Sequence, residues 1–527
     1  MVRPRARGAP MFSVWKAIAS GFLFAAIATG LAAAPALAVE ESPQATNTIA
    51  DTLFADAARR AAALAAAPYA PPSTDLPKAF DGLDYDGYRK LRPRPETMVW
   101  GKAGNPFAAL PLPRGGLYRD PVAIHFVDAT GAVERHVSPS FVDFVDFPAA
   151  NDNTRAKLGA SGWRAITKPG QAGAGYEFAV FQGGTYFRAV GEGQVYGVSA
   201  RALAIGTGSA AGEEFPRFTD FWILEPQTSK TGVKDESLTF IALADSPSAA
   251  AAYRFVLRPG RDATIDVAAE IHPRTDIVEA GVAPLSSMYL RGPADPHMKS
   301  DARAEVHDSD GLSILSTYGD HIWRPLANPA SVQVSAFVGT PAGFGLEQRR
   351  REPEAYADSE AKYERRPSIW IEPQGDWGEG EVRLLEIPTA NEYADNVAAF
   401  WRPAEAWRAG SVQRLGYRLH WMDGPHAAPV ARVVSTTIAT APESKRLQRI
   451  MIDFRGASGF AARDLRPDVW ATSAVLSNIH VTSDADALVR LTFDLEPGAS
   501  PVIELHAALA NSTSQQTETW LFRWTPE

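Results

Sequence analysis

The chain has 527 residues, no cysteine and a formal net charge of −9. The lack of cysteine excludes disulfides, thiolate metal sites and cysteine nucleophiles. The acidic balance argues against nucleic acid and anionic membranes as partners, because both carry negative charge themselves. A neutral substrate fits this charge, and the length allows a large core and two domains.

Residues 1–38 have the layout of a secretory signal peptide. Their charged residues are all cations and precede an apolar run over 17–34. The small residues Ala36 and Ala38 suit signal peptidase, so we expect cleavage after Ala38. An uncleaved anchor helix is the alternative, but the run is short of the ~20 apolar residues that a bilayer span requires. The sequence therefore predicts an exported protein.

A helix is predicted shortly after the signal peptide. Thr48 or Asn47 can cap it, and its apolar pattern runs over 51–66. Proline at Pro68 and beyond ends the pattern. We therefore assign 39–74 to an N-terminal helical and linker segment.

Short segments of alternating apolar and polar residues, broken by Gly and Pro, fill the rest of the chain. Residues 332–338 are one example, with valine or alanine at every second position. This period of two is typical of antiparallel β structure, so the fold class is predicted to be mainly β. Breaks between Trp401 and Gly410 suggest a domain boundary there.

The C-terminal part, 410–527, is predicted to be a small β-sandwich of the immunoglobulin-like sort. Its strand candidates are 432–437, 447–454, 488–495, 502–509 and 519–524. Strict alternation in the last of these places Trp520, Phe522 and Trp524 on one face, where we expect them to enter a core.

Two acidic segments lie in a region that is rich in aromatic residues and arginine. The first, 305–312, contains Asp308, and the second, 386–396, contains Glu392 and Asp395. Sugar-processing sites combine carboxylates with rings that stack on a pyranose and with planar cations that bind hydroxyls. Between the two segments lie further candidates of these types, among them Trp323, Tyr363 and Arg366.

Each of these residues also has a structural interpretation. An Asp before Ser-Asp-Gly, such as Asp308, commonly forms a turn through its own backbone. His307 is more often a structural hydrogen-bonding residue than a base. The run 349–351 consists of three arginines that could bind an anion, although a solvated rim is the simpler interpretation.

No motif predicts a cofactor or a metal. The string from Gly191 to Gly197 resembles a dinucleotide fingerprint, but its last glycine is one position late, and turn or strand glycines explain it better. The chain has no P-loop, HExxH or GxSxG motif, and none of its ten histidines forms an i,i+4 pair.

Several strings, occurring in one order, carry a resemblance to a known family. They are Thr185-Tyr186-Phe187-Arg188, Gly193-Gln194-Val195-Tyr196-Gly197, Gly212-Glu213-Glu214-Phe215-Pro216-Arg217-Phe218, 307–312 and 386–396. With these strings the chain resembles the periplasmic glucan biosynthesis proteins G and D from about Tyr69 to its C-terminus. The resemblance implies a large β-sandwich similar to sugar mutarotases over 75–402, followed by the small immunoglobulin-like domain.

The resemblance also implies a role in making osmoregulated periplasmic glucans, in the periplasm. Some similar proteins hydrolyse β-1,2-glucan by inversion, which would make Asp395 the general acid and Asp308 the general base. Substrate-binding positions would be Glu392, Tyr363, Arg366, His307 and Trp323. The expected partner is a linear or branched β-1,2-linked glucan, with a membrane glucan synthase as a further candidate.

Two alternatives remain open at this point. The chain could bind glucan and steer its export without breaking bonds, or it could transfer glucan chains with the same acid. The sequences of 316–321 and 350–354 differ from those of well-known family members, so product length and the choice between hydrolysis and transfer stay open.

Overall fold

The computed structural model describes residues 48–102, 105–136, 142–147, 150–168, 175–226, 237–294, 302–444, 446–456, 464–483 and 488–526. All of them belong to one compact unit, 47–527. The predicted signal peptide lies outside the described residues. Within the described ranges, no helix is both long enough and apolar enough to cross a membrane.

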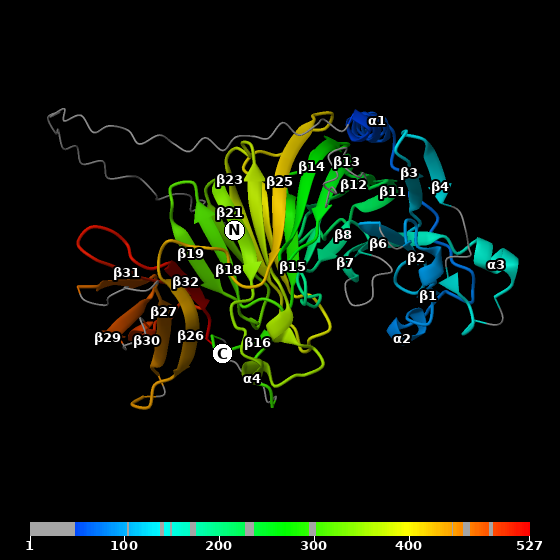
Figure 1. Cartoon of the computed structure of the whole chain (residues 1–527). Coiled ribbons are helices and arrows are strands. Elements are labelled where there is room, and N and C mark those ends of the chain that lie inside the picture. The colour runs from blue at the N-terminus through cyan, green and yellow to red at the C-terminus, as the bar shows by residue number, and fades with distance from the viewer. Residues whose placement is uncertain are drawn as a thin grey trace, which may run out of the picture. The chain divides into compact units, whose positions relative to one another are not determined.

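The structure is mainly β, as predicted, and two large sheets dominate it (Figure 1). The first is a ten-stranded sheet whose order along the path is β2-β6-β7-β8-β9-β15-β24-β23-β20, with β10 also paired to β15. Its strands are β2 (Phe107–Pro113), β6 (Ala160–Thr167), β7 (Tyr176–Gln182), β8 (Tyr186–Ala189), β9 (Ser199–Arg201), β10 (Leu203–Ile205), β15 (Ala280–Ser287), β20 (Gln333–Val338), β23 (Gly380–Glu386) and β24 (Val397–Pro403).

The second large sheet has fourteen strands, in the order β28-β31-β32-β19-β18-β21-β22-β25-β14-β13-β12-β11-β3-β4. Its strands are β3 (Ala123–Val127), β4 (Val133–His136), β11 (Arg217–Leu224), β12 (Leu238–Asp245), β13 (Ala249–Arg258), β14 (Ala263–Pro273), β18 (Gly311–Ser316), β19 (His321–Pro325), β21 (Pro341–Glu347), β22 (Ser368–Gln374), β25 (Gln413–Met422), β28 (Arg466–Ala471), β31 (Ile503–Ala510) and β32 (Thr519–Trp524). Its pairs are antiparallel except β3 with β11 and β19 with β32, which are parallel.

The main hydrophobic core lies between these two sheets. Phe181 and Phe187 come from the first sheet and stack on each other with ring centres 5.2 Å apart. Phe240 and Phe255 come from the second and stack at 4.7 Å, and Phe181 meets Phe240 edge to face at 4.7 Å. Aromatic pairs of this geometry add to the free energy gained by burial, so the two layers are fixed against each other.

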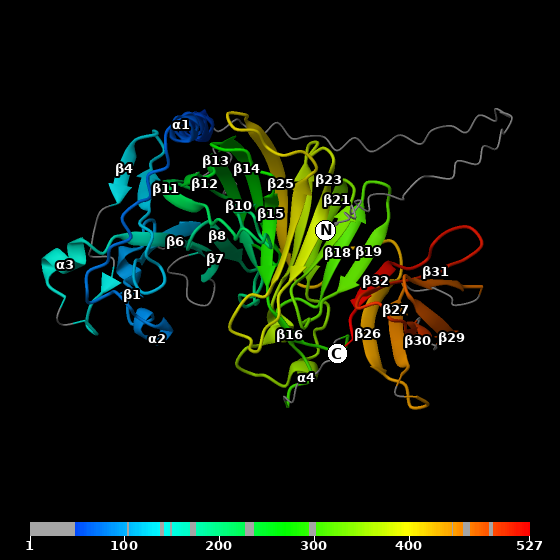
Figure 2. The same cartoon turned by 180° about the vertical axis from the view of Figure 1, so that it is seen from behind.

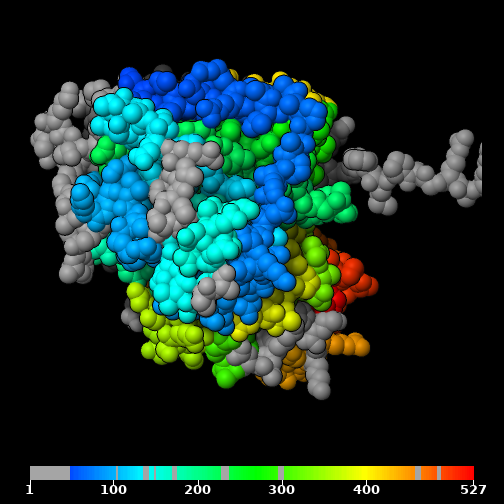
Figure 3. Space-filling view, turned by 90° about the vertical axis from the view of Figure 1, so that its right-hand side faces the viewer, coloured from blue at the N-terminus to red at the C-terminus, as the bar shows by residue number. Residues whose placement is uncertain are grey.

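Helix α1 (Thr48–Ala65) confirms the predicted N-terminal helix. Its Ala57 and Ala61 pack against Ile241 and Ala252, on the face of β12 and β13 that points away from the main core. These strands are therefore buried on both faces, which explains their nearly continuous apolar sequence. In Figure 3, α1 runs along one edge of the molecule. The other helices among the described residues are short: α2 (Tyr85–Tyr88), α3 (Asp152–Ala156), α4 (Pro353–Tyr356) and the 3₁₀ turns η1 (Pro95–Thr97) and η3 (Tyr363–Arg365).

A four-stranded sheet, in the order β26-β27-β30-β29, forms the second layer of the C-terminal part (Figures 1 and 2). Its strands are β26 (Arg432–Thr440), β27 (Gln448–Arg455), β29 (Ala474–Ser483) and β30 (Leu488–Pro497). Trp520, Phe522 and Trp524 of β32 share a core with residues of this sheet such as Ile450 and Phe493. The predicted alternation in the last strand is therefore confirmed. Two-stranded pairs complete the structure: β1 (Arg92–Pro93) with β5 (Val142–Asp143), and β16 (Tyr289–Arg291) with β17 (Val306–His307).

The junction between the two parts differs in detail from the expected boundary at 402–410. Strand β25 pairs with β14 and β22 in the middle of the large sheet. The C-terminal core begins only at Ala431. Moreover, β32 pairs with β19 through Trp323 and Trp520, so one sheet continues across the junction. We therefore place the start of the C-terminal part between Met422 and Ala431.

Candidate active site

The end of strand β15 brings the two acidic segments together. The backbone N–H of Asp308 donates to the carbonyl of Met288 over 2.8 Å, and the N–H of Asn396 donates to the carbonyl of Ser287 over 3.0 Å. The hydroxyls of Ser287 and Ser309 lie 2.8 Å apart. Asp308 and Asp395, which are distant in sequence, are thereby held beside adjacent residues of one chain segment.

Asp308 is buried, with 4% of its surface exposed. Its carboxylate accepts a hydrogen bond from the guanidinium of Arg366. Burial, together with the negative charge of Asp395, raises the pKa of Asp308 to about 6, although the positive charges of Arg366 and Arg188 oppose that rise. The carboxyl of Asp308 can therefore gain or lose a proton close to neutral pH.

Arg366 is positioned by aromatic contact and by a close approach of the backbone. Its guanidinium lies 4.5 Å from the centre of the Tyr363 ring, within the range of a cation–π contact. A Cβ at Gly197 would lie 2.9 Å from the Cβ of Arg366. A side chain at 197 would therefore displace Arg366, which gives a physical reason for the last glycine of the string 193–197.

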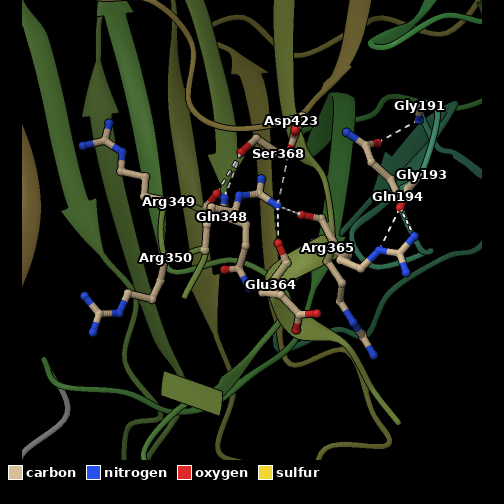
Figure 4. Close-up of polar contacts among 12 residues, drawn as sticks. Gly191, Gly193, Gln194, Gln348, Arg349, Arg350, Glu364, Arg365, Ser368 and Asp423 are labelled. Carbon is tan, nitrogen blue, oxygen red and sulfur yellow. Dashed lines mark hydrogen bonds and ion pairs between the residues drawn. The ribbon is translucent and has the colours of Figure 1, made fainter. Parts of the chain in front are cut away.

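The loop from Gly191 to Gly197 is fastened to the turn that carries Arg366 (Figure 4). The Arg365 side chain donates to the carbonyl of Gly193, and the N–H of Val195 donates to the carbonyl of Arg365 over 3.1 Å. Inside the loop, the Gln194 side chain accepts the N–H of Gly191 over 2.7 Å. The glycines thus form a turn, as the sequence indicated.

Asp395 lies in the connection between β23 and β24. Its neighbour Asn396 is buried and closes this connection, because its side chain donates to the carbonyls of Tyr289 and Ile387 over 3.0 and 2.9 Å. The Asp395 side chain itself is 33% exposed, and its carboxylate lies 3.7 Å from the guanidinium of Arg188. Asp395 is thus open to solvent while its backbone is fixed.

Glu392 and Tyr363 join the same site. Arg303 bridges Glu392 and Asp358, with nitrogen–oxygen distances of 2.5 and 2.8 Å. Burial, followed by the charge of Glu392, raises the pKa of Tyr363, and Asp308 acts in the same direction. The structure therefore places Arg366 and Tyr363 beside Asp308, with Glu392 close to Tyr363.

His307 belongs to the buried support of the site. It is 1% exposed, and its ring nitrogens lie 2.9 Å from the side chain of Gln348 and 3.1 Å from that of Glu305. Burial alone would lower the pKa of His307, but the hydrogen bond to Glu305 and the charge of Asp310 raise it overall. Gln348 in turn donates to the carbonyls of His307 and Tyr363, so this network fixes the backbone beside Asp308.

Trp323 lies elsewhere. It is 4% exposed, is part of the C-terminal core, and stacks under the guanidinium of Arg349 at 3.5 Å. Arg349 forms ion pairs with Glu347 and Glu518 at 2.8 and 2.7 Å. The interpretation of 349–351 as a solvated rim is therefore wrong for Arg349, because a tertiary contact with the C-terminal part buries it. Its side chain and that of Arg350 point away from Arg365 in Figure 4.

Arg188, Tyr186 and Arg303 were not among the site residues expected from the sequence. Two of them lie in the string 185–188, which carried the resemblance. In β8 the alternation puts Tyr186 and Arg188 on one face while Phe187 enters the core. That alternation is a signal that could have identified them.

The chemistry available here is that of two carboxyl groups with arginine and tyrosine donors. One carboxyl is buried, and the other is partly open to solvent. Such a pair can exchange protons with a neutral substrate, while guanidinium and phenol groups bind hydroxyls. Among the described residues, no three His, Asp or Glu side chains gather in a way that could hold a metal ion.

Comparison with known proteins finds relatives that match nearly the whole chain. Glucans biosynthesis protein G of Rhodopseudomonas palustris is 42% identical over 509 residues, which cover 95% of this chain and 99% of that protein. Its counterpart in Vibrio cholerae is 40% identical over 475 residues, covering 89% and 86%. That of a Shewanella strain is 41% identical over 474 residues, covering 88% and 85%. The sequence pattern described as "Periplasmic glucan biosynthesis protein, MdoG" matches residues 53–524, and the chain therefore belongs to this family.

Proposed function

We propose that this chain is an exported, periplasmic glycoside hydrolase that cleaves the β-1,2-linked backbone of osmoregulated periplasmic glucans by inversion. Membership of the glucan biosynthesis family supports a role in making these glucans. The observation that carries the proposed chemistry is the convergence of Asp308 and Asp395 on the end of β15.

In the proposed mechanism, Asp395 is the general acid. It is partly exposed, so a glycosidic oxygen can reach its carboxyl, either directly or through a bound hydroxyl. Arg188 stabilises the carboxylate that remains after the proton has left.

Asp308 is the general base in this mechanism. Because its pKa is about 6, it is ionised at neutral pH and is still basic enough to take a proton from water. Arg366 directs its carboxylate, while Tyr363 and Glu392 bind sugar hydroxyls nearby. Inversion requires the two carboxyl groups to lie roughly 6.5 to 9.5 Å apart, so that the attacking water fits between Asp308 and the sugar.

Two rival functions use the same residues. A glucan-binding or export scaffold would keep both acids as hydrogen-bond acceptors. A transglycosylase would use Asp395 as an acid and accept a sugar hydroxyl in place of water. We favour catalysis over a passive scaffold because a buried and a partly exposed carboxyl converge on one site, and the raised pKa of Asp308 is compatible with a base there. Water is the simplest acceptor, so hydrolysis is proposed ahead of transfer.

The test is incubation of the purified mature protein with linear β-1,2-glucan. We expect shorter chains whose new reducing ends first appear in the α configuration, as proton NMR can record. Asp395→Asn and Asp308→Asn should each lower turnover by about 10² to 10⁴ while glucan affinity changes little, because the amide keeps the shape but cannot transfer the proton.

Asp376→Asn is the matched control. Asp376 is exposed at the turn between β22 and β23, where it accepts the N–H of Gly378, a bond that an asparagine oxygen can also accept. This variant should keep full turnover. Longer or cyclic products would favour transfer, and binding without any change of the polymer would favour the scaffold.

A further inference from the structure

A groove of about 600 Å³ begins beside Asp395, and its walls include Leu117, Tyr186, Arg188, Phe215 and Arg217. Arg188 connects the groove to the site, because it forms the ion pair with Asp395. Its volume is within the ~300 to 1,000 Å³ that ligand pockets commonly have. The groove therefore adjoins the proposed reaction centre through Arg188 and is large enough for part of a chain of sugars.

Apolar side chains in this groove are exposed to an unusual degree. Leu117 is 92% exposed and Phe215 is 52% exposed. Single exposed apolar residues are common on protein surfaces and need no ligand. Here, however, both line one groove together with Tyr186.

The aromatic walls are held by a buried cation. Arg201 is 4% exposed, and its guanidinium lies 5.1 Å from the centre of the Tyr186 ring and 5.8 Å from that of Phe215. Glu213 fixes this guanidinium through a hydrogen bond, and Thr207 bonds to the same carboxylate oxygen. One buried cation thus contacts two rings that both line the groove.

Polar groups complete the groove. Arg217 forms an ion pair with Asp120 at 2.6 Å, and both side chains are partly exposed. Tyr186 also lies close enough to Asp395 for that charge to contribute to the raised pKa of the phenol, after burial as the main cause. Tyr186 therefore lines the groove and is also near Asp395.

We propose that this groove is a chain-binding subsite in which Phe215 and Leu117 stack on glucosyl units that lie several residues from the bond to be cleaved. Pyranose rings present a C–H face that packs on such side chains, and Arg217 with Asp120 binds their hydroxyls. The inference rests on the proposed function for the identity of the substrate, and it goes further by naming residues that set the preference for long chains.

The experiment compares linear β-1,2-glucan oligosaccharides of increasing length. Phe215→Ala should lower kcat/KM about tenfold for long chains and leave the shortest cleaved chain unchanged, because only long chains reach the groove. Leu117→Ala should show the same length dependence with a smaller effect. Phe215→Trp, unlike Phe215→Ala, should keep the preference for long chains, because the indole ring still offers a face for stacking.

Trp470→Ala is the matched control. Trp470 is an aromatic residue of similar exposure, 47% against 52% for Phe215, but it lies on β28 in the C-terminal part and not in the groove. It should leave kcat/KM unchanged at every length. An equal loss at all lengths for Phe215→Ala, or no loss at any, would overturn the subsite.

A binding measurement tests the subsite independently of whether the protein hydrolyses glucan. If the wild-type protein cleaves nothing, calorimetry with long linear β-1,2-glucan should still show about tenfold weaker binding for Phe215→Ala, and none of that weakening for Trp470→Ala. In that case the hydrolase assignment fails and the subsite holds. If affinity for the long glucan is the same in Phe215→Ala as in the wild type, the subsite fails too.

Discussion

The two carboxyl groups of the candidate site lie in contrasting surroundings. Asp308 is almost fully buried and bonded to Arg366, whereas Asp395 is one third exposed and 3.7 Å from Arg188. One aspartate carboxyl is therefore removed from water, whereas the other stays in contact with it. Burial makes the charge of Asp308 costly and its partner important, while solvent screens the pair at Asp395.

The largest expected effect on stability comes from the buried side of this comparison. Arg366→Ala should lower the free energy of unfolding by about 3 kcal/mol at neutral pH, because the ionised Asp308 would be left buried without its partner. Urea denaturation followed by tryptophan fluorescence measures this. Arg365→Ala is the control, since the side chain of this neighbouring arginine is exposed and donates to the carbonyl of Gly193, and it should cost less than about 1 kcal/mol. Equal losses of unfolding free energy in the two variants would contradict the difference expected between the partner of a buried carboxylate and an exposed arginine.

The second prediction concerns the pH dependence of stability. The pKa of Asp308 is raised to about 6 from 3.8, so the folded protein holds this proton more tightly than the unfolded chain does. The stabilising contribution is complete below about pH 4 and is lost as the pH rises through about 6. Asp308→Asn cannot ionise and escapes this loss. Relative to the wild type, its free energy of unfolding should rise by roughly 3 kcal/mol between about pH 3.5 and pH 7.5.

Urea midpoints of both proteins across this range provide the measurement. A difference between them that does not vary with pH would show that Asp308 titrates in the folded protein as it does in the unfolded chain. Burial would then not raise the pKa of Asp308, which contradicts the expected contrast with the exposed Asp395 side chain.

The smallest effect on stability is expected at the exposed pair. Arg188→Ala should change the free energy of unfolding by less than about 1 kcal/mol, because both partners are substantially exposed and 3.7 Å apart. Turnover of β-1,2-glucan should nevertheless fall about tenfold, since the charge that stabilises the Asp395 carboxylate is gone. A stability loss as large as that of Arg366→Ala, measured in the same urea series, would mean that Arg188 acts as a structural residue.

Much of the local structure could be predicted from the sequence, because its causes are local. Helix α1 begins at Thr48 and ends at Ala65, shortly before Pro68, whose missing N–H cannot continue a helix. The face of β32 that carries Trp520 follows from a side-chain period of two. The two acidic segments were candidates from the sequence itself, but the acid and base roles of Asp395 and Asp308 came only from the resemblance, since an Asp before Ser-Asp-Gly is more commonly a turn former.

Only the tertiary structure decided which strands and side chains meet. Alternation shows that a strand has an apolar face, but it does not name the partner strand, so the parallel pairing of β19 with β32 was not predicted. For the same reason Trp323 was expected in the site, although it packs in the C-terminal core under Arg349.

The sequence by itself determined the composition, the secondary-structure periods and the presence of two acidic segments. The position of Asp308 next to Asp395, its pKa of about 6 and the groove at Phe215 depend on residues that are far apart in the chain. Burial and electrostatic interaction act through space, and no property of the neighbouring residues in the sequence contains them. The fold of β15 against both segments is what creates the candidate site.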